Sequence, residues 1–252
     1  MFYHIVIPAR LRSSRLPEKV LAPIGGLPMI EHVWRAAGAA SARSVCVATD
    51  DVRIATAVRE FGGQCLMTRD DHASGSDRIA EVAEALELED DAVLVNLQGD
   101  EPEMPPACLD QVAGLLRSGG DVATLYWPIS EAREIQDPNA VKVVVDGQGR
   151  ALYFSRAPVP HARDAKDDDR ALAAGVPYRR HLGLYAYRVA ALKRFTAAAP
   201  SELERAEGLE QLRFLDLGMT IRIDEAVSAI PAGVDSPEDL ARVRARMEGQ
   251  HD

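Results

Sequence analysis

Residues 3–19 read YHIVIPARLRSSRLPEK, and this stretch decides the class of fold. The run from Tyr3 to Ile7 is short, apolar and rich in β-branched residues, which predicts a buried strand. The loop that follows, Pro8 to Lys19, carries four cationic side chains and one acidic one. Ligands of an open parallel sheet bind beyond the carboxyl ends of its strands. The stretch therefore predicts a first parallel strand followed by a ligand-binding loop.

The chain downstream of this loop alternates between short apolar runs and segments with helical periodicity. The expected strands are 44–49, 64–68 and 92–97, and the expected helices are 28–40, 51–60, 76–86 and 106–117. Such a βαβ alternation is typical of a parallel sheet between two layers of helices. We therefore expect an α/β fold, Rossmann-like, with three layers and a mainly parallel sheet.

The pattern changes beyond residue 121. Residues 140–145 and 151–154 flank Asp146-Gly147-Gln148-Gly149 as the strands of a hairpin would, so we expect the sheet to become antiparallel here. Residues 162–174 are dense in charge and alanine and predict a mobile loop. Together these features suggest a smaller β-rich elaboration at about 123–190, within a single domain of residues 1–252.

The last part of the chain returns to alternating elements. A strand is expected at 181–188, helical structure at 204–217, a further strand at 221–224, and a final helix that starts at Ser236-Pro237. The elaboration is thus expected to sit inside one α/β domain.

Composition excludes several classes of protein. The 252 residues include 29 basic and 39 acidic side chains, a net charge of −10, so a nucleic-acid partner would need a segregated basic face, which the sequence does not show. The three cysteines are odd in number and lack metal-site spacing. The apolar start is too short for a membrane span. We expect a cytoplasmic protein without a membrane or nucleic-acid partner.

The cationic loop has the chemistry of a polyphosphate site. Arg10, Ser13, Arg15 and Lys19 combine guanidinium groups, a hydroxyl and an ammonium group. Neither a G-x-x-x-x-G-K-[ST] motif nor a G-x-G-x-x-G motif follows the first strand. Phosphates would therefore be held by side chains, although a charge run of this kind is often only a solvated loop.

Two carboxylates are candidates for a magnesium site. Asp100 comes just after the apolar strand that ends at Leu97, and Asp235 follows a strand-like stretch near the end of the chain. Mg²⁺ keeps several waters and takes phosphate oxygens from its substrate, so one or two protein carboxylates suffice. By position alone, Asp100 is equally a turn residue and Asp235 a residue that serves the start of a helix.

The motifs together carry a resemblance. The run R-x-x-S-x-R-L-P-x-K at 10–19 resembles the CTP-binding signature of the sugar-acid cytidylyltransferases, above all the CMP-Kdo synthetases. The similarity extends over nearly the whole chain, through residues 25–30, 67–78, 95–102, 138–142, 153–156, 181–185, 209–213 and 233–240. One departure is Glu18, where the family usually has glycine; an acid beside Lys19 is expected either to weaken phosphate attraction or to point to water.

The resemblance implies a reaction and a set of residues. It implies CMP transfer from CTP to the anomeric hydroxyl of Kdo (3-deoxy-D-manno-octulosonate), for lipopolysaccharide biosynthesis, by a magnesium-dependent homodimer. The implied catalytic residues are Lys19, Arg15, Asp100 and Asp235, of which Asp100 and Asp235 hold the metal. The implied nucleotide-binding residues are Ala9, Arg10, Ser13, Arg15, Lys19, Ser74 and Gln98. The implied sugar-binding residues are Gln98, Arg156, His181, Tyr185, Glu210 and Gln211.

Other functions remain open at this point. The R-L-P sequence argues against a sialic acid cytidylyltransferase, whereas 8-amino-Kdo is not excluded as the substrate. A nicotinamide-dependent oxidoreductase would need a glycine fingerprint where Arg10-Leu11-Arg12 stands. A non-catalytic nucleotide sensor on the same fold is a third alternative.

Overall fold

The computed structural model describes residues 2–11, 15–72 and 74–248. Within this part of the chain a central sheet of nine strands has the main order β11-β7-β10-β6-β1-β4-β5, and the hairpin β8–β9 pairs with β10. The strands are β1 Tyr3–Ala9, β4 Ser44–Thr49, β5 Gln64–Met67, β6 Val93–Asn96, β7 Val122–Pro128, β8 Lys142–Val145, β9 Ala151–Ser155, β10 Arg179–Arg188 and β11 Ile221–Glu225. A separate two-stranded ribbon pairs β2 (Pro23–Ile24) with β3 (Leu27–Pro28).

The direction of the strands places several chain segments at one edge of the sheet. Strand β1 runs parallel to β4 and β6, and β4 runs parallel to β5. Strand β10 is antiparallel to β6 and β7, and Tyr185 pairs with Asn96 at the end of β6. The first half of β10 therefore lies at the same edge as the carboxyl ends of β1, β4 and β6.

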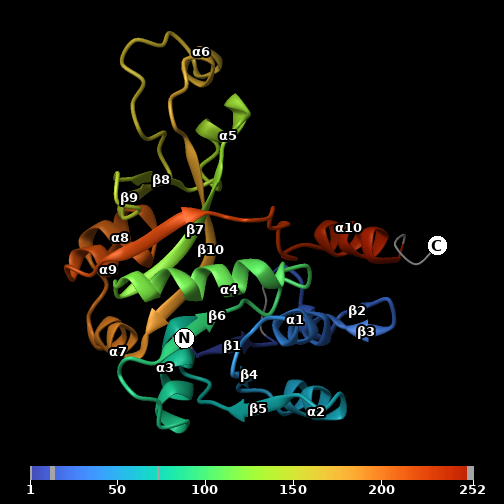
Figure 1. Ribbon diagram of the computed structural model, residues 1–252. Helices are drawn as coiled ribbons and strands as arrows, with labels where there is room; N and C mark the ends of the chain where they lie inside the picture. Colours follow the sequence, from blue (N-terminus) through green and yellow to red (C-terminus); the bar gives the residue numbers. More distant parts are fainter. Residues whose placement is uncertain (1, 12–14, 73, 249–252) are drawn as a thin grey trace.

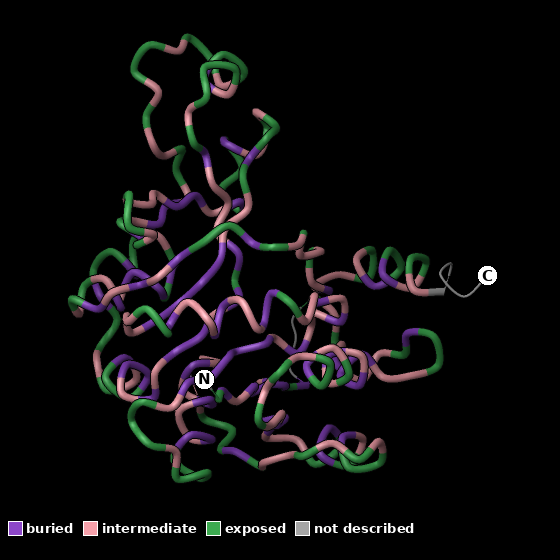
Figure 2. The backbone as a smooth tube through the Cα atoms, in the orientation of Figure 1, coloured by how far each residue is buried: buried purple, intermediate pink, exposed green. Residues whose placement is uncertain are grey.

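Helices cover both faces of the sheet, which confirms the three-layer α/β fold (Figure 1). Alternation along β1 separates the layers: Ile5 and Ile7 pack on one face and Val6 on the other. The first face is covered by α1 (Met29–Gly38), α2 (Val52–Glu60) and α4 (Pro106–Leu115). The second face is covered by α3 (Gly75–Ala85), α7 (Val189–Ala197) and α9 (Gln211–Asp216). Figure 2 shows the buried residues along the strands between these layers.

An arm projects from the sheet between β7 and β10 (Figure 1). It carries α5 (Ala132–Gln136), the hairpin β8–β9 and α6 (Asp168–Ala173). The prediction of a mobile loop over 162–174 was wrong in one respect, because α6 lies inside it. Asp167 caps α6 by accepting from the backbone of Arg170, and buried Ala171 joins a small apolar cluster with Ile129, Ile135 and Tyr178. Apolar burial, which the charge-rich sequence hid, orders this segment.

The predicted helix over 204–217 is two helices. The first, α8 (Glu202–Glu207), begins with a capping box between Ser201 and Glu204 and ends at Gly208, whose φ of 62° is left-handed. The second is α9. Gly208 thereby turns the chain so that residues 208–211 face the sheet edge.

The C-terminal helix α10 (Pro237–Glu248) packs beside the β2–β3 ribbon, in a cluster of Ile24, Met29, Val234, Leu240 and Val243. The remaining short elements are the 3₁₀ helices η1 (Lys19–Leu21) and η2 (Leu116–Ser118).

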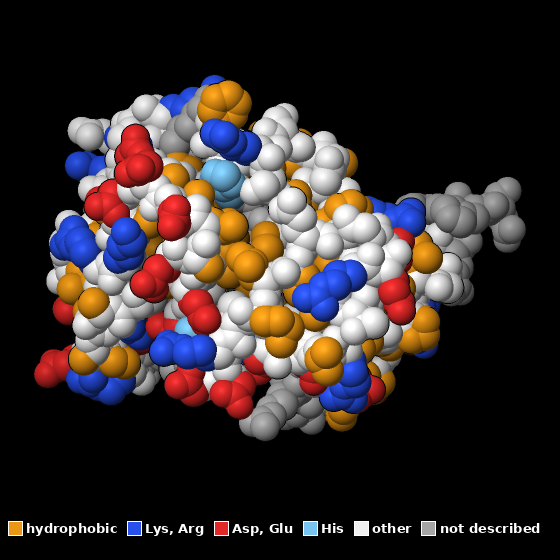
Figure 3. All heavy atoms as spheres, turned by 90° about the horizontal axis from the view of Figure 1, so that it is seen from below, with side chains coloured by type: hydrophobic (Ala, Val, Ile, Leu, Met, Phe, Trp, Pro, Cys, Tyr) orange, Lys and Arg blue, Asp and Glu red, His pale blue; other side chains and the backbone are white. Residues whose placement is uncertain are grey.

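The distribution of charged side chains on the surface agrees with the acidic net charge of the sequence. On the face in Figure 3, the coloured acidic and basic side chains are interspersed and form no continuous basic area. Among the described residues, no helix combines the length and apolar character that a bilayer crossing needs.

Candidate active site

Two carboxylates and two cations converge at the carboxyl edge of the sheet. Lys19 Nζ donates to Asp100 Oδ2 at 2.5 Å and to Asp235 Oδ1 at 2.9 Å, and an Arg15 Nη2 lies 3.0 Å from Asp235 Oδ2. The lysine comes from the loop after β1, Asp100 from the turn after β6, and Asp235 from the residues before α10. A backbone hydrogen bond of 2.8 Å from Val234 N to Asp100 O joins the last two segments. The structure thus brings together the four residues expected to be catalytic.

The lysine is held as a cation. Its side chain is only 13% exposed, and this burial lowers the pKa of Lys19, but the charges of Asp100 and Asp235 more than offset it, so the net pKa is raised. The ammonium group therefore stays protonated at neutral pH and bridges the two acids.

Asp100 and Asp235 are the residues that would hold a magnesium ion. Because they share the Lys19 nitrogen, Asp100 Oδ2 and Asp235 Oδ1 are no more than roughly 5.4 Å apart, so the two carboxylates lie at one place. Within the described residues no three His, Cys, Asp or Glu side chains form a cluster of the kind that binds a metal by protein ligands alone. Such a pair suits Mg²⁺, which relies on waters and phosphate oxygens for the rest of its shell.

Glu18, the departure from the family pattern, points away from this cluster. Its carboxylate forms an ion pair of 2.6 Å with Arg53 of α2, and both side chains are more than half exposed. Its backbone has a φ of 55°, the left-handed region that glycine adopts without cost. The backbone conformation thus accounts for the glycine that the family usually carries here.

A small cavity of about 90 Å³ lies beside the end of β1. It is lined by Pro8, Ala9, Arg10, His72, Ser74, Gly75, Arg78 and Gln98. Four of the residues expected to bind the nucleotide, Ala9, Arg10, Ser74 and Gln98, thus meet in one place. Ser13, a fifth, lies outside the described residues.

A second cavity of about 310 Å³ adjoins the first, and Gly75 and Gln98 line both. Its other lining residues are Ser76, Asn96, Tyr185, Tyr187, Gly208, Leu209, Glu210, Gln211 and Phe214. Four of the six residues expected to bind the sugar, Gln98, Tyr185, Glu210 and Gln211, are therefore in its wall. Burial raises the pKa of Glu210, although the Arg213 charge opposes this.

The other two expected sugar residues do not line this cavity. Arg156 lies next to Gly208, and its guanidinium donates to the backbone oxygens of Pro138, Glu207 and Gly208. His181 packs edge-on against Phe154, with ring centroids 4.9 Å apart, and its Nε2 lies 3.0 Å from Thr124 Oγ1. Burial lowers the pKa of His181 to about 3, so the ring is neutral. Each contacts a residue of the cavity wall: Arg156 contacts Gly208, and His181 lies against the ring of Tyr185.

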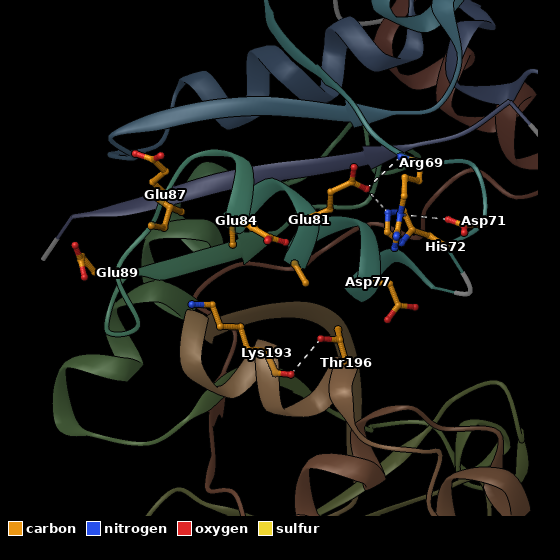
Figure 4. Close-up of a pocket in the computed structure, with 13 residues that line it drawn as sticks. Arg69, Asp71, His72, Asp77, Glu81, Glu84, Glu87, Glu89, Lys193 and Thr196 are labelled. Carbon is orange, nitrogen blue, oxygen red and sulfur yellow. Dashed lines mark hydrogen bonds and ion pairs between the residues drawn. The ribbon is translucent and has the colours of Figure 1, made fainter.

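A larger cavity, of about 1010 Å³, lies elsewhere, along the outer side of α3 and α7 (Figure 4). It includes Glu81, Glu84, Glu87 and Lys193, and it includes none of the residues that the sequence predicted for the site. Size alone therefore does not identify the active site, and the two smaller cavities beside the Lys19 cluster are the better candidates.

Sequence reasoning missed several residues of these cavities. His72, Arg78, Ser76, Asn96 and Tyr187 line them without having been assigned a role. His72, Ser76 and Arg78 belong to the motif at 67–78, so the signal was present, but their side-chain directions depend on tertiary structure.

Comparison with known proteins agrees with this geometry. The family model described as "Cytidylyltransferase" matches residues 4–221. The 3-deoxy-manno-octulosonate cytidylyltransferase of Pseudomonas syringae pv. syringae is 52% identical over 250 residues, which cover 98% of each chain. This chain belongs to the 3-deoxy-manno-octulosonate cytidylyltransferase family. Another family member, from Pseudomonas fluorescens Pf-5, is 51% identical over 249 residues and 98% of each chain.

Solved structures extend the comparison to three dimensions. A CMP:2-keto-3-deoxy-manno-octonic acid synthetase solved in complex with CTP superposes with a TM-score of 0.90 at 43% identity, covering 99% of this chain and 100% of the other. A cytidylyltransferase of Leptospira borgpetersenii shares the fold, with a TM-score of 0.63 at 12% identity over 99% of this chain and 88% of the other.

Proposed function

We propose that this family member transfers CMP from CTP to the anomeric hydroxyl of Kdo and releases pyrophosphate. The observation that carries the proposal is the Lys19 ammonium group bridging Asp100 and Asp235, beside two cavities that share Gln98. The smaller cavity is suited to a nucleoside base and the larger to a sugar. The product would activate the sugar for lipopolysaccharide biosynthesis.

The reaction joins an oxygen to phosphorus. The anomeric oxygen forms a bond with the α-phosphorus of CTP, the bond from that phosphorus to the oxygen of the departing pyrophosphate breaks, and the hydroxyl proton passes to solvent. Transfers of this type depend on positioning and charge stabilisation more than on covalent chemistry. Lys19 and Arg15 would hold the phosphates and stabilise the negative charge that grows on pyrophosphate.

Asp100 and Asp235 are the residues that would hold Mg²⁺. The bound ion would neutralise phosphate charge and lower the pKa of the attacking hydroxyl. Since Lys19 donates to the oxygens that the ion needs, we expect its ammonium group to turn to the phosphates when the nucleotide binds.

The second cavity offers the mixture of groups that a polyhydroxy acid needs. Tyr185, Glu210, Gln211 and Gln98 present hydroxyl, carboxylate and amide groups to bind hydroxyls. We propose that Arg156, held beside Gly208 by three backbone oxygens, faces the sugar carboxylate, and that His181 supports Tyr185, whose ring centroid lies 5.3 Å from its own.

We also propose that the protein is cytoplasmic and forms a homodimer. The free thiols Cys46, Cys65 and Cys108 suit a reducing cytoplasm. The arm between β7 and β10 is the surface that we assign to a homodimer contact, supported by Leu152, an apolar side chain on the hairpin that is 56% exposed. Sedimentation of a monomer at micromolar concentration would contradict the dimer.

The direct test is pyrophosphate release from CTP with Mg²⁺. Acceptors would be Kdo, its 8-amino analogue, sialic acid and none, each with the wild type, Asp100→Ala and, as a surface control, Asp90→Ala. The Asp90 side chain pairs with Lys193 at the surface and is 70% exposed. We expect release that needs Kdo, falls at least about 100-fold in Asp100→Ala and persists in Asp90→Ala. Release only with another acid sugar would change the substrate, and no release with any acceptor would favour a nucleotide sensor.

A further inference from the structure

His72 stands between the small cavity beside β1 and the large cavity along α3. Its side chain is 4% exposed, and it lines both cavities. A buried imidazole at the wall of a base-sized cavity presents either a donor or an acceptor to whatever binds there, depending on which ring nitrogen carries the proton. The partner of the ring therefore determines what the cavity can recognise.

Glu81 of α3 is that partner. Its Oε2 contacts His72 Nε2 and also accepts from Arg69 N at 3.1 Å, and Figure 4 shows the Glu81 carboxylate turned from α3 toward the His72 ring. Burial raises the pKa of Glu81, but the hydrogen bonds from His72 and the Arg69 backbone more than offset it and lower the net pKa. The carboxylate is thus ionised and can only accept, so Nε2 donates, and in the tautomer that carries its proton on Nε2 the other ring nitrogen, Nδ1, is an acceptor.

His72 lines the small cavity as well as the outer one, whereas Glu81 lines the outer cavity. The contact with Glu81 occupies Nε2 of the ring. Nδ1 is therefore the ring nitrogen that remains for a ligand in the small cavity.

Most of the other polar side chains of the cavity are donors or already paired. Arg10 and Arg78 carry only donors. Ser74 serves the cap of α3, where its hydroxyl exchanges hydrogen bonds with Asp77. Gln98 lies at the border with the second cavity, where its amide nitrogen donates to Asn96 at 3.2 Å and its amide oxygen is a second acceptor. Of these two acceptors, His72 is the one that lines the small cavity but not the second cavity.

Cytosine and uracil differ at the group that such an acceptor distinguishes. Cytosine carries an exocyclic amino group, a donor, where uracil carries a carbonyl oxygen, an acceptor. We propose that His72 Nδ1 accepts from the amino group of cytosine, so that His72 is a specificity-determining residue and Glu81 its positioning residue. The assignment of this cavity to the base rests on the proposed function.

Two nearly isosteric variants of His72 test the roles of its two ring nitrogens separately. His72→Gln places an amide near the Nε2 position, keeps the bond to Glu81 and removes the acceptor from the cavity. His72→Asn places an amide oxygen near the Nδ1 position and gives up the bond to Glu81. Glu81→Ala tests the positioning, because both tautomers of His72 then become accessible. His4→Gln is the matched control, since His4 is a half-buried histidine on β1 that contacts Ser44 instead.

The measurement is the dissociation constant of CTP and of UTP by calorimetry, with Mg²⁺ and without acceptor sugar. We expect the preference for CTP over UTP to fall about tenfold or more in His72→Gln, by a smaller factor in Glu81→Ala, and by less than about threefold in His72→Asn, while His4→Gln leaves it unchanged. A purely structural role would weaken both nucleotides equally. An equal loss, or a wild type that does not prefer CTP, would overturn the proposal.

The binding assay tests the role of His72 and the pyrophosphate assay tests the proposed reaction, so either proposal can fail without the other. A wild type that prefers CTP through His72 but does not turn over any acid sugar would remove the proposed reaction and leave the base recognition. A wild type that turns over Kdo, with an unchanged preference in His72→Gln, would remove only the role of His72. Circular dichroism would show whether each variant is folded, and the glutamine and asparagine variants test the same acceptor independently.

Discussion

Gly99, in the turn after β6, packs against the end of β1, and we expect Gly99→Ala to displace the backbone of the site. A Cβ at its ideal position would lie 3.0 Å from the backbone oxygen of Pro8 and 3.6 Å from both Ala9 Cβ and Ile30 Cδ1. Because the nearest atom belongs to the backbone, the methyl group is accommodated only if the turn or the end of β1 moves by a few tenths of an ångström.

The expected magnitude follows from this contact. Overpacking of this kind costs about 1–3 kcal/mol of folding free energy, or a fall in Tm of roughly 2–4 °C per kcal/mol for a chain of this size. The shift passes directly to Gln98 and Asp100, the neighbours of Gly99 in sequence. Misplacement of reacting groups by about 1 Å costs about 100-fold in rate, so a few tenths of an ångström should lower kcat about tenfold or somewhat less.

The assay compares Gly99→Ala with Gly114→Ala by pyrophosphate release and by thermal melting. Gly114 lies inside α4 and has no atom within 4 Å of an ideal Cβ, so alanine there should raise the free energy of unfolding by up to about 1 kcal/mol without affecting kcat. Wild-type kcat and Tm in Gly99→Ala would refute the reasoning, because they would show that the end of β1 leaves room for a methyl group on the turn.

Three other substitutions test separate features of the structure. His181 is protonated below about pH 6.5 in the unfolded chain but stays neutral down to about pH 3 in the folded chain, so the free energy of unfolding decreases as the pH is lowered. Between pH 7.5 and 5.5, His181→Gln should remove about 1 kcal/mol of this decrease. An unchanged pH dependence of Tm in the variant would contradict this. Glu18→Gly should raise Tm by a few degrees by relieving the left-handed backbone, with kcat unchanged, and a lower Tm would show that the ion pair with Arg53 matters more. Ser201→Ala removes the cap of α8 and should cost about 1 kcal/mol in denaturant unfolding, unless water replaces the hydroxyl, in which case the midpoint stays unchanged.

Local sequence predicted the first half of the fold well because its signals are local. The alternation of Ile5, Val6 and Ile7 encodes a strand buried on both faces, and the period of α1 to α4 encodes helices with one apolar side. The prediction failed where a weak local signal depends on distant contacts. The clearest case is α6, where charge density concealed the burial of Ala171 against Ile129 and Tyr178.

For the site, the sequence by itself determined which functional groups are available and where two of the segments lie. The cationic loop follows the first strand and Asp100 follows another parallel strand, so both lie at the carboxyl edge of the sheet. Only the tertiary structure decided that the antiparallel β10 places Tyr185 beside Asn96, that Asp235 reaches Lys19 across more than two hundred residues, and that His72 turns one nitrogen to Glu81. The physical reason is that strand pairing and side-chain direction are set by long-range packing, whereas residue type and strand polarity are written locally.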